Sequence, residues 1–261
     1  MSTSSSTPNQ SGSVDSAVAD GVAVVEFGHP KSNSLPSWLL RGIAEEISSV
    51  GARHDVRVVV VRSLGAGAFC AGASFDELSA IADEVEGKEF FMGFARVILA
   101  MTRCPKPVIA RVHGKAVGGG VGLVAAADYA MAASGAAVRL SELAVGIGPF
   151  VVGPAIERKV GHGRLAALSI DADWRDAAWA ERHGLYARVF ESTEALDDGL
   201  SDFVRKLASR NPEALAEIKR ITWAGTDDWP RLLEERAALS GRLVLSRFAR
   251  EAIQAAKTPR R

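Results

Sequence analysis

Two short runs of β-branched residues, each followed by a glycine-rich segment, constrain the fold of this chain most. Val56–Val61 and Val108–Val112 are almost continuously apolar, which predicts strands buried on both faces. The segments around them predict a strand at Val22–Phe27 and helices at Trp38–Ser49, Asp76–Ala82, Phe90–Thr102 and Leu123–Ala127. This alternation of strands and helices is typical of an α/β domain with mostly parallel strand pairing.

Composition divides the chain into three segments. Residues 1–20 are rich in Ser, Thr and Gly, so we expect a disordered tail whose few apolar side chains cannot offset the entropy of ordering. Residues 21–195 form the predicted α/β core, and residues 196–261 a C-terminal helical region whose apolar side chains pack on the core or on a neighbouring subunit. The helices predicted late in the chain are Trp174–Arg182, Ser201–Ser209, Pro212–Ala224 and Trp229–Ala256.

Charge and cysteine content exclude several classes of function. The 31 Lys and Arg residues balance the 31 Asp and Glu residues, which argues against binding to nucleic acid or to an anionic membrane surface. No apolar run is long enough to predict a membrane span. Cys70 and Cys104 are too few for a disulfide framework or a zinc cluster, so we expect a reducing, cytoplasmic location. The histidines show no HExxH spacing, and we expect no metal site.

The glycine cluster before Leu123 admits several interpretations. Gly120–Ala125 matches GxGxxA, and Glu142 lies 142 − 122 = 20 residues past Gly122, as in a dinucleotide site of an NAD-dependent oxidoreductase. The match is weak, because such a motif begins directly after its strand and His113–Gly119 intervene here. A phosphate-binding loop is excluded because Lys115 precedes the glycines, and a nucleophile elbow is excluded because Asp76 replaces its second glycine.

A different interpretation joins two distant glycine segments. Phe69–Ala73 and Val117–Gly120 each follow a predicted buried strand. If those strands are neighbours, one backbone N–H group from each loop can converge on a single oxygen and form an oxyanion hole. The alternative is that both loops are glycine-rich only because strands and helices pack tightly there.

These segments together resemble the enoyl-CoA hydratase/isomerase (crotonase) family. The matching segments are Val58–Arg62, Ala68–Leu78, Lys106–Gly114, Gly118–Gly120, Asp128 and Leu140–Ile147. The resemblance implies a crotonase-like spiral of ββα repeats with a C-terminal helical trimerisation region. It also implies a homotrimer or a dimer of trimers, acyl-CoA thioester substrates, and no cofactor beyond the coenzyme A of the substrate.

The resemblance also implies the residues of the site. The oxyanion donors are the N–H groups of Ala73 and Gly119. The substrate-binding residues that it implies are Ser34, Leu35, Ala71, Gly72, Gly118 and Gly122, with Phe150 near the acyl group. Ser34 and Leu35 would lie near the pantetheine, and the loop around Ala71 near the adenine end of coenzyme A.

One departure from the family pattern bears on the reaction. Family hydratases carry two glutamates; here the first position is Gly122 and the second is Glu142. A single glutamate can move a proton between two carbons of an enoyl thioester, or hydrate it less efficiently. Apolar neighbours would raise its pKa towards neutral. Three alternatives stay open: a hydratase for a branched, methylglutaconyl-type thioester, a non-catalytic acyl-CoA-binding protein, and a purely surface role for Glu142 next to a helix beginning near Leu143.

Overall fold

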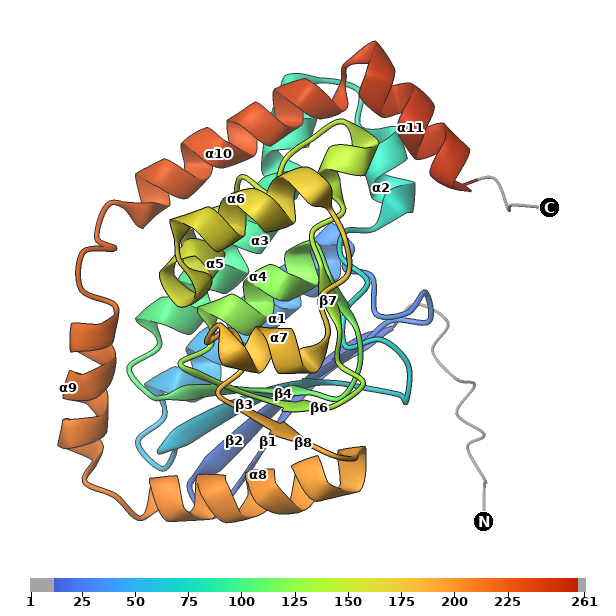
Figure 1. Ribbon diagram of the computed structural model, residues 1–261. Coiled ribbons are helices and arrows are strands. Elements are labelled where there is room, and N and C mark those ends of the chain that lie inside the picture. Colours follow the sequence, from blue (N-terminus) through green and yellow to red (C-terminus); the bar gives the residue numbers. More distant parts are fainter. Residues whose placement is uncertain (1–11, 258–261) are drawn as a thin grey trace, which may run out of the picture.

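A six-stranded sheet organises the chain in a computed structural model that describes residues 12–257 (Figure 1). The strands follow the order β1-β2-β3-β4-β6-β8; β1 runs antiparallel to β2, and every other neighbouring pair is parallel. The strands are β1 (Ser13–Ala19), β2 (Val22–Gly28), β3 (Val58–Ser63), β4 (Val108–Val112), β6 (Tyr129–Ala133) and β8 (Arg188–Phe190). The predicted α/β class with mostly parallel pairing is confirmed. A second sheet pairs β5 (Ala116–Val117) with β7 (Val138–Arg139).

The predicted disordered tail, residues 1–20, is wrong for its second half. Ser13–Ala19 forms β1, which pairs along its whole length with β2, from Ser13 opposite Gly28 to Ala19 opposite Val22. A tight turn with Asp20 and Gly21 at positive φ joins the two strands. The hydrogen bonds of this hairpin, together with Val14 and Val18 packed on the core, outweigh the ordering entropy of a polar segment. Residues 1–11 lie outside the described residues.

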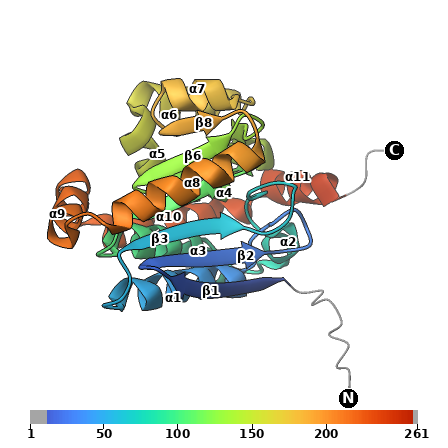
Figure 2. The same ribbon diagram turned by 90° about the horizontal axis from the view of Figure 1, so that it is seen from below.

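The central strands are covered on both faces, as their continuous apolar runs predicted. Val59, Val61 and Val112 face α1 (Ser37–Ala52), α3 (Glu84–Arg103) and α4 (Gly119–Ala126). Val58, Val60 and Ile109 face the opposite side, where α8 (Thr193–Ala208) lies across the sheet (Figure 2). The remaining helices are α2 (Phe75–Ala80), η1 (Glu142–Val145), α5 (Gly153–Val160), α6 (His162–Asp171), α7 (Ala177–Arg182), α9 (Pro212–Thr222), α10 (Trp229–Val244) and α11 (Arg247–Lys257).

Helix α4 contains the glycines that the sequence analysis placed in a loop. Gly120 and Gly122 are buried helical residues rather than turn residues. A Cβ atom on Gly120 would lie 2.7 Å from the Cβ of Cys70, so this glycine permits a close contact between helix and loop. The dinucleotide interpretation is therefore wrong, because the first glycine of a GxGxxA motif has to form the tight turn before the helix, and Gly120 lies inside α4.

The C-terminal helices wrap the edge of the molecule (Figure 1). The segment predicted as one helix, Trp229–Ala256, is two, α10 and α11, separated at Leu245 and Ser246. Helix α10 packs on α3, and a Cβ atom on Gly241 would lie 2.4 Å from the backbone nitrogen of Lys88, so the two backbones touch. Its apolar face is thus buried on its own chain. Among the described residues, no helix is both long and apolar enough to cross a membrane.

A buried ion pair fixes α9 to the start of two strands. The Asp128 carboxylate accepts hydrogen bonds from Lys219 Nζ at 2.7 Å, Trp223 Nε1 at 2.6 Å and the Val108 backbone N–H at 2.6 Å. Lys219, 5% exposed, also donates to the carbonyl oxygens of Met101 and Lys106. Every charged atom of the pair therefore has a partner, which is the condition under which a buried ion pair is tolerated.

We expect Lys219→Met to lower the free energy of unfolding by about 3–5 kcal/mol, because it leaves the Asp128 carboxylate buried without its counter-charge. Chemical denaturation monitored by circular dichroism measures this loss. Lys206→Met on the exposed face of α8 is the matched control and should change stability by less than about 0.5 kcal/mol. Equal, small losses for both variants would contradict the structural role of the pair.

Candidate active site

The two glycine-rich loops meet beyond the carboxyl ends of β3 and β4, as the sequence analysis anticipated. Val117 N–H donates to the Cys70 carbonyl at 2.9 Å, and Cys70 N–H donates to the Lys115 carbonyl at 3.3 Å. The Gly72 N–H points at the Cys70 sulfur, 3.4 Å away. Cys70 is fully buried between the loops, and burial raises the pKa of its thiol to about 12, so it acts as a packing residue and not as a nucleophile.

The N–H groups of Ala73 and Gly119 are both free for a ligand. The backbone of Leu35 pairs on either side of Ala73: Leu35 N–H donates to the Gly72 carbonyl at 2.8 Å, and Ser74 N–H donates to the Leu35 carbonyl at 3.2 Å. Ala73 N–H therefore lies on the other side of this segment. Gly119 begins α4, where N–H groups lack helical partners. Within residues 12–257 neither N–H has a hydrogen-bond acceptor, and both residues line one cavity.

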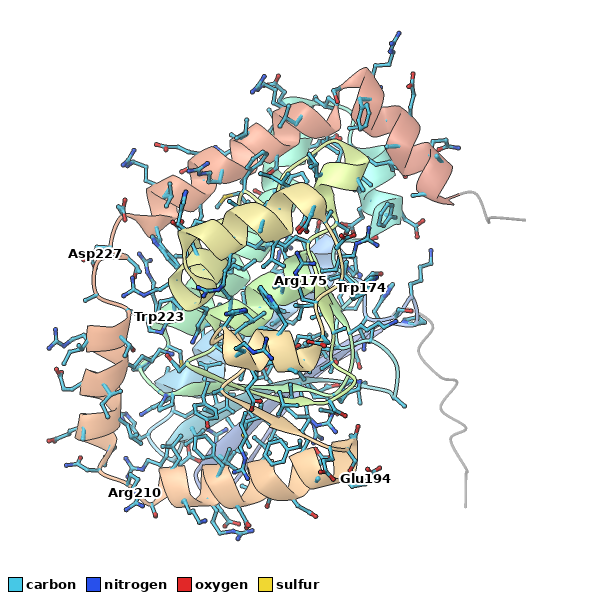
Figure 3. All side chains as sticks on the ribbon, viewed as in Figure 1. Trp174, Arg175, Glu194, Arg210, Trp223 and Asp227 are labelled. Carbon is cyan, nitrogen blue, oxygen red and sulfur yellow. The ribbon has the colours of Figure 1, made fainter. Side chains whose placement is uncertain are left out.

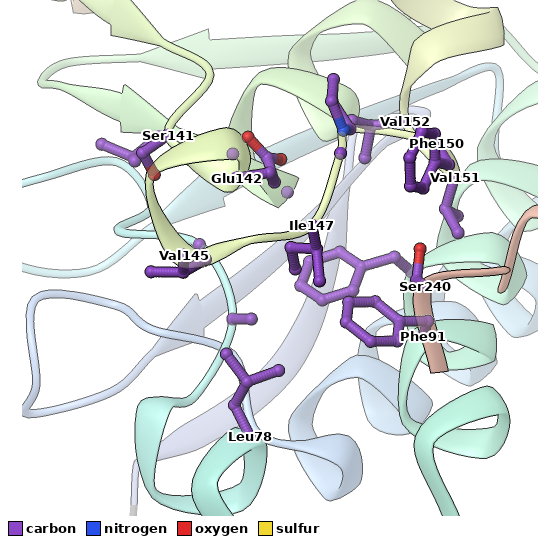
Figure 4. A pocket seen from close by; sticks show the side chains of 18 of the residues that line it. Leu78, Phe91, Ser141, Glu142, Val145, Ile147, Phe150, Val151, Val152 and Ser240 are labelled. Atoms are coloured by element: carbon purple, nitrogen blue, oxygen red, sulfur yellow. The ribbon is translucent and has the colours of Figure 1, made fainter. Parts of the chain in front are cut away.

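This cavity has apolar walls and a volume of about 590 Å³, its open mouth included. Figure 4 shows Glu142 and Ser141 on one side and Phe91, Phe150 and Ser240 on the other. Glu142 is the single titratable side chain among the lining residues that the structure describes. The others are Ala71, Gly72, Ala73, Phe75, Leu78, Phe94, Val117, Gly118, Gly119, Val145, Ile147, Gly148, Pro149, Val151 and Val152.

The carboxylate of Glu142 is largely shielded from water. Its Oε2 atom is buried and has no hydrogen-bond partner among the described residues. A Cβ atom on Gly118 would lie 3.1 Å from Oε1, so only a glycine leaves room for the carboxylate at this point. Burial raises the pKa of Glu142 to about 7, although the backbone N–H groups of Glu142 and Ser141 oppose the shift. The interpretation of Glu142 as a surface acid is wrong.

The apolar sequence neighbours account for only part of this desolvation. Leu140 is buried and Val145 lines the cavity, but Leu143 and Ala144 are exposed on the short turn η1. The other cavity walls exclude the remaining water from the carboxylate. A carboxyl group with a pKa near neutrality, next to two free N–H groups, can take up and return a proton while negative charge develops on a neighbouring oxygen.

Comparison with known proteins agrees with this geometry. The sequence model of the family "Enoyl-CoA hydratase/isomerase" matches residues 17–257. The chain belongs to the enoyl-CoA hydratase/isomerase family. It is 31% identical over 201 residues to the short-chain-enoyl-CoA hydratase of Clostridium acetobutylicum (76% of each chain). It is also 31% identical over 191 residues to the crotonyl-CoA hydratase of Syntrophomonas wolfei (72% of this chain, 71% of the relative).

A solved structure shows the same fold. The crystal structure of an enoyl-CoA hydratase from Mycobacterium avium superposes with a TM-score of 0.82 at 28% identity, covering 93% of this chain and 95% of that one. The crotonase-like fold that the sequence predicted is therefore confirmed, and the protein is an enzyme of the enoyl-CoA hydratase/isomerase family.

This family member departs from a two-glutamate site in a way that the structure explains. Gly122 does not line the cavity, because Val152 covers it: a Cβ atom on Gly122 would lie 2.4 Å from Val152 Cγ1. No side chain fits at position 122 unless Val152 moves. Gly122 therefore makes no direct contact with the cavity, contrary to its predicted substrate-binding role. Val152 is the residue that faces the cavity at this point.

The other predicted site residues divide into two groups. Ala71, Gly72, Ala73, Gly118, Gly119, Glu142 and Phe150 all line the cavity. Ser34 and Leu35 do not; Leu35 is fully buried and positions the Ala73 loop through its backbone, while Ser34 Oγ lies 3.2 Å from His29 Nδ1. Their contact with a pantetheine stays a prediction.

Sequence reasoning missed most of the cavity wall. Phe91 and Phe94 come from α3, and Ser240 comes from α10, far from both glycine loops in sequence. The only available signal was the helical spacing of Phe90, Phe91 and Phe94, which also fits an ordinary core. The Ser74 hydroxyl accepts the Glu77 N–H at 3.4 Å and caps the start of α2.

We expect Gly122→Ala to destabilise the protein by about 1–3 kcal/mol, because the overpacking against Val152 outweighs the better helix propensity of alanine. In the background of Val152→Gly the same substitution should cost much less, and urea denaturation of the four proteins of this double-mutant cycle measures the coupling. Gly163→Ala, whose Cβ meets nothing within 4 Å, is the control. Additive losses of stability would show that the contact with Val152 does not limit which side chain fits at position 122.

Proposed function

We propose that this enzyme isomerises the double bond of a 3-enoyl-CoA thioester to the conjugated 2-position. The observation that carries the proposal is that one carboxyl group, Glu142, is the only described titratable side chain in the cavity, while Val152 fills the space beside Gly122. A 1,3-proton shift needs one group that removes and returns the same proton. It requires no redox cofactor, since the substrate is neither oxidised nor reduced.

The proposed mechanism assigns a role to each of three groups. The thioester oxygen accepts hydrogen bonds from the N–H groups of Ala73 and Gly119. Deprotonated Glu142 removes a proton from the α carbon, and the resulting enolate is stabilised by about 3–4 kcal/mol per donor. Glu142 then delivers the proton to the γ carbon, so the double bond moves to the α,β position and the carboxylate is regenerated.

Three alternatives are less well supported. A methylglutaconyl-type thioester carries a free carboxylate on its acyl group, and none of the described residues lining this cavity is a Lys or Arg that would neutralise it. Hydration needs a water molecule held at the β carbon, and the hydroxyl of Ser240 already donates to the Arg236 carbonyl at 3.1 Å. A non-catalytic acyl-CoA-binding role would leave the unpartnered, proton-accepting carboxyl of Glu142 without a purpose.

We also propose that the enzyme acts as a homotrimer or a dimer of trimers in the cytoplasm. Two large apolar side chains on the C-terminal helices support an association surface: Ile221 on α9 is 63% and Phe248 on α11 is 64% exposed. A subunit interface over these helices would remove the side chains from water.

We expect Glu142→Gln to lower turnover of a 3-enoyl-CoA by about 10²–10⁴-fold, because an amide cannot carry the proton, while thioester binding persists. Product analysis by mass spectrometry and chromatography measures this: the wild-type product is the conjugated isomer, with the mass of the substrate. Glu84→Gln on the exposed start of α3 is the control. A product heavier by one water would replace the proposed isomerase with a hydratase, and full activity of Glu142→Gln would exclude Glu142 as the proton carrier.

We expect kcat/KM to rise with pH through a midpoint at about 7. Burial raises the pKa of Glu142 to about 7, and the free enzyme needs the deprotonated form to remove the α proton. Activity is thus present above this pH and is lost as pH falls through it. Stopped assays between acidic and mildly alkaline pH give the profile, and a flat profile across neutrality would contradict the assignment.

A further inference from the structure

A second cavity lies at the opposite end of the sheet from Glu142. It is lined where β4 and β6 begin, at Pro107, Asp128 and Tyr129, and it is covered by α8 and α9. The volume is about 1080 Å³, its open mouth included. It shares no lining residue with the cavity that contains Glu142. Figure 3 labels Trp223, which borders this cavity at the end of α9.

The walls of this second cavity are apolar on one side. Ile109 comes from the sheet, Phe203 and Leu207 from α8, and Leu215 and Ile218 from α9. The ring of Tyr129 stacks on Phe203 with 4.6 Å between ring centroids, which gives this side a flat aromatic surface. Ile218 is 59% exposed, so the apolar lining continues to the mouth.

The other side carries more positive than negative charge. Arg158, Lys159 and Lys219 face one carboxylate, that of Asp128, within the lining. Asp128 is already saturated by Lys219, Trp223 and Val108. Three cations minus one anion leave two cationic side chains, Arg158 and Lys159, without a carboxylate partner among the lining residues.

Lys159 has unused hydrogen-bonding capacity. Its Nζ atom donates one long hydrogen bond, 3.3 Å, to the Asp128 backbone carbonyl and lies 5.9 Å from the Trp223 ring centroid. An ammonium has three N–H donors, so two lack an acceptor within residues 12–257. Burial lowers the pKa of Lys159, and the nearby Asp128 carboxylate only partly opposes this shift. Arg158 lies beside it, 5.6 Å from the same ring. Its Nε donates to the Thr222 carbonyl and its Nη2 to the carbonyls of Thr222 and Ala224, so Nη1 is the part of the guanidinium that can meet a ligand.

We propose that this second cavity binds a small amphipathic carboxylate, such as a free medium-chain acid, with the carboxylate on Lys159 and Arg158. The apolar body lies between Tyr129–Phe203 and the side chains of Leu207 and Ile218. Charge complementarity selects this class of ligand: a neutral apolar molecule leaves the two cations unpaired, and an inorganic anion leaves the apolar walls in water. Such a ligand joins α8 and α9 to the start of the sheet.

The test uses the full-length enzyme and octanoate as the probe. Isothermal titration calorimetry should show saturable octanoate binding. The tryptophan fluorescence, to which the five tryptophans including Trp223 at the cavity contribute, should change with the same saturation. The neutral analogue octanol should bind about tenfold or more weakly, because it cannot pair with a cation. Lys159→Met should lose about the same factor for octanoate, while Lys206→Met on the outer face of α8 should not.

A second variant and a competition experiment separate loss of the second cavity from misfolding and from binding at the Glu142 cavity. Leu215→Trp fills the cavity from α9 and should abolish binding even if Lys159→Met does not fold. Octanoate should still bind when a non-hydrolysable acyl-CoA analogue saturates the Glu142 cavity, whatever reaction that cavity catalyses. The proposal is overturned if octanoate binding does not saturate at millimolar concentration, or if the acyl-CoA analogue displaces octanoate. It is also overturned if Lys159→Met and the wild type bind octanoate alike. Light scattering and fluorescence showing that a second copy of the chain covers Trp223 would overturn it as well.

Discussion

The hydrogen bonds between the two loops beyond β3 and β4 are the constraint on which the active site depends. Cys70 exchanges backbone hydrogen bonds with Lys115 and Val117, and these bonds hold the Ala73 and Gly119 N–H groups at the mouth of one cavity. The loops can pair because β3 and β4 are parallel neighbours whose carboxyl ends meet at one edge. Donors on two rigid loops need no reorganisation when negative charge develops on an oxygen, and they therefore stabilise that charge strongly.

Close glycine contacts determine the shape of the cavity around those donors. A Cβ atom on Gly119 would lie 2.0 Å from the Phe94 ring, and one on Gly118 would approach the Glu142 carboxylate. The same short helix therefore presents an N–H group, touches an aromatic wall and borders the acid. At Gly122 the space is occupied by Val152. This chain therefore differs from a two-glutamate site in two ways: position 122 has no carboxylate, and the packing of Val152 leaves no room for one.

The sequence was informative where local pattern and topology coincide. Continuous β-branched runs predicted β3 and β4, and two glycine loops after adjacent strands predicted that Ala73 and Gly119 come together. The sequence pattern did not predict features that depend on a contact between residues far apart in the chain. Ser13–Ala19 has a polar composition and is ordered by pairing with β2; Phe91 and Ser240 reach the cavity from separate helices; and the contact of Gly122 with Val152 joins residues thirty positions apart. Such contacts leave no periodicity in the chain.

The balance between burial and charge decides what Glu142 can do. A fully solvated glutamate carboxylate has an ordinary pKa of 4.5 and would be a weak base towards a carbon acid. Desolvation by the cavity walls raises its affinity for a proton, yet the pKa stays near neutrality because two backbone N–H groups still stabilise the anion. Stronger burial would leave the group protonated and unable to start the reaction. The backbone N–H groups of Ser141 and Glu142 and the apolar cavity walls therefore act together: the N–H groups keep the carboxylate ionisable, and the walls make it basic enough to accept a proton from carbon.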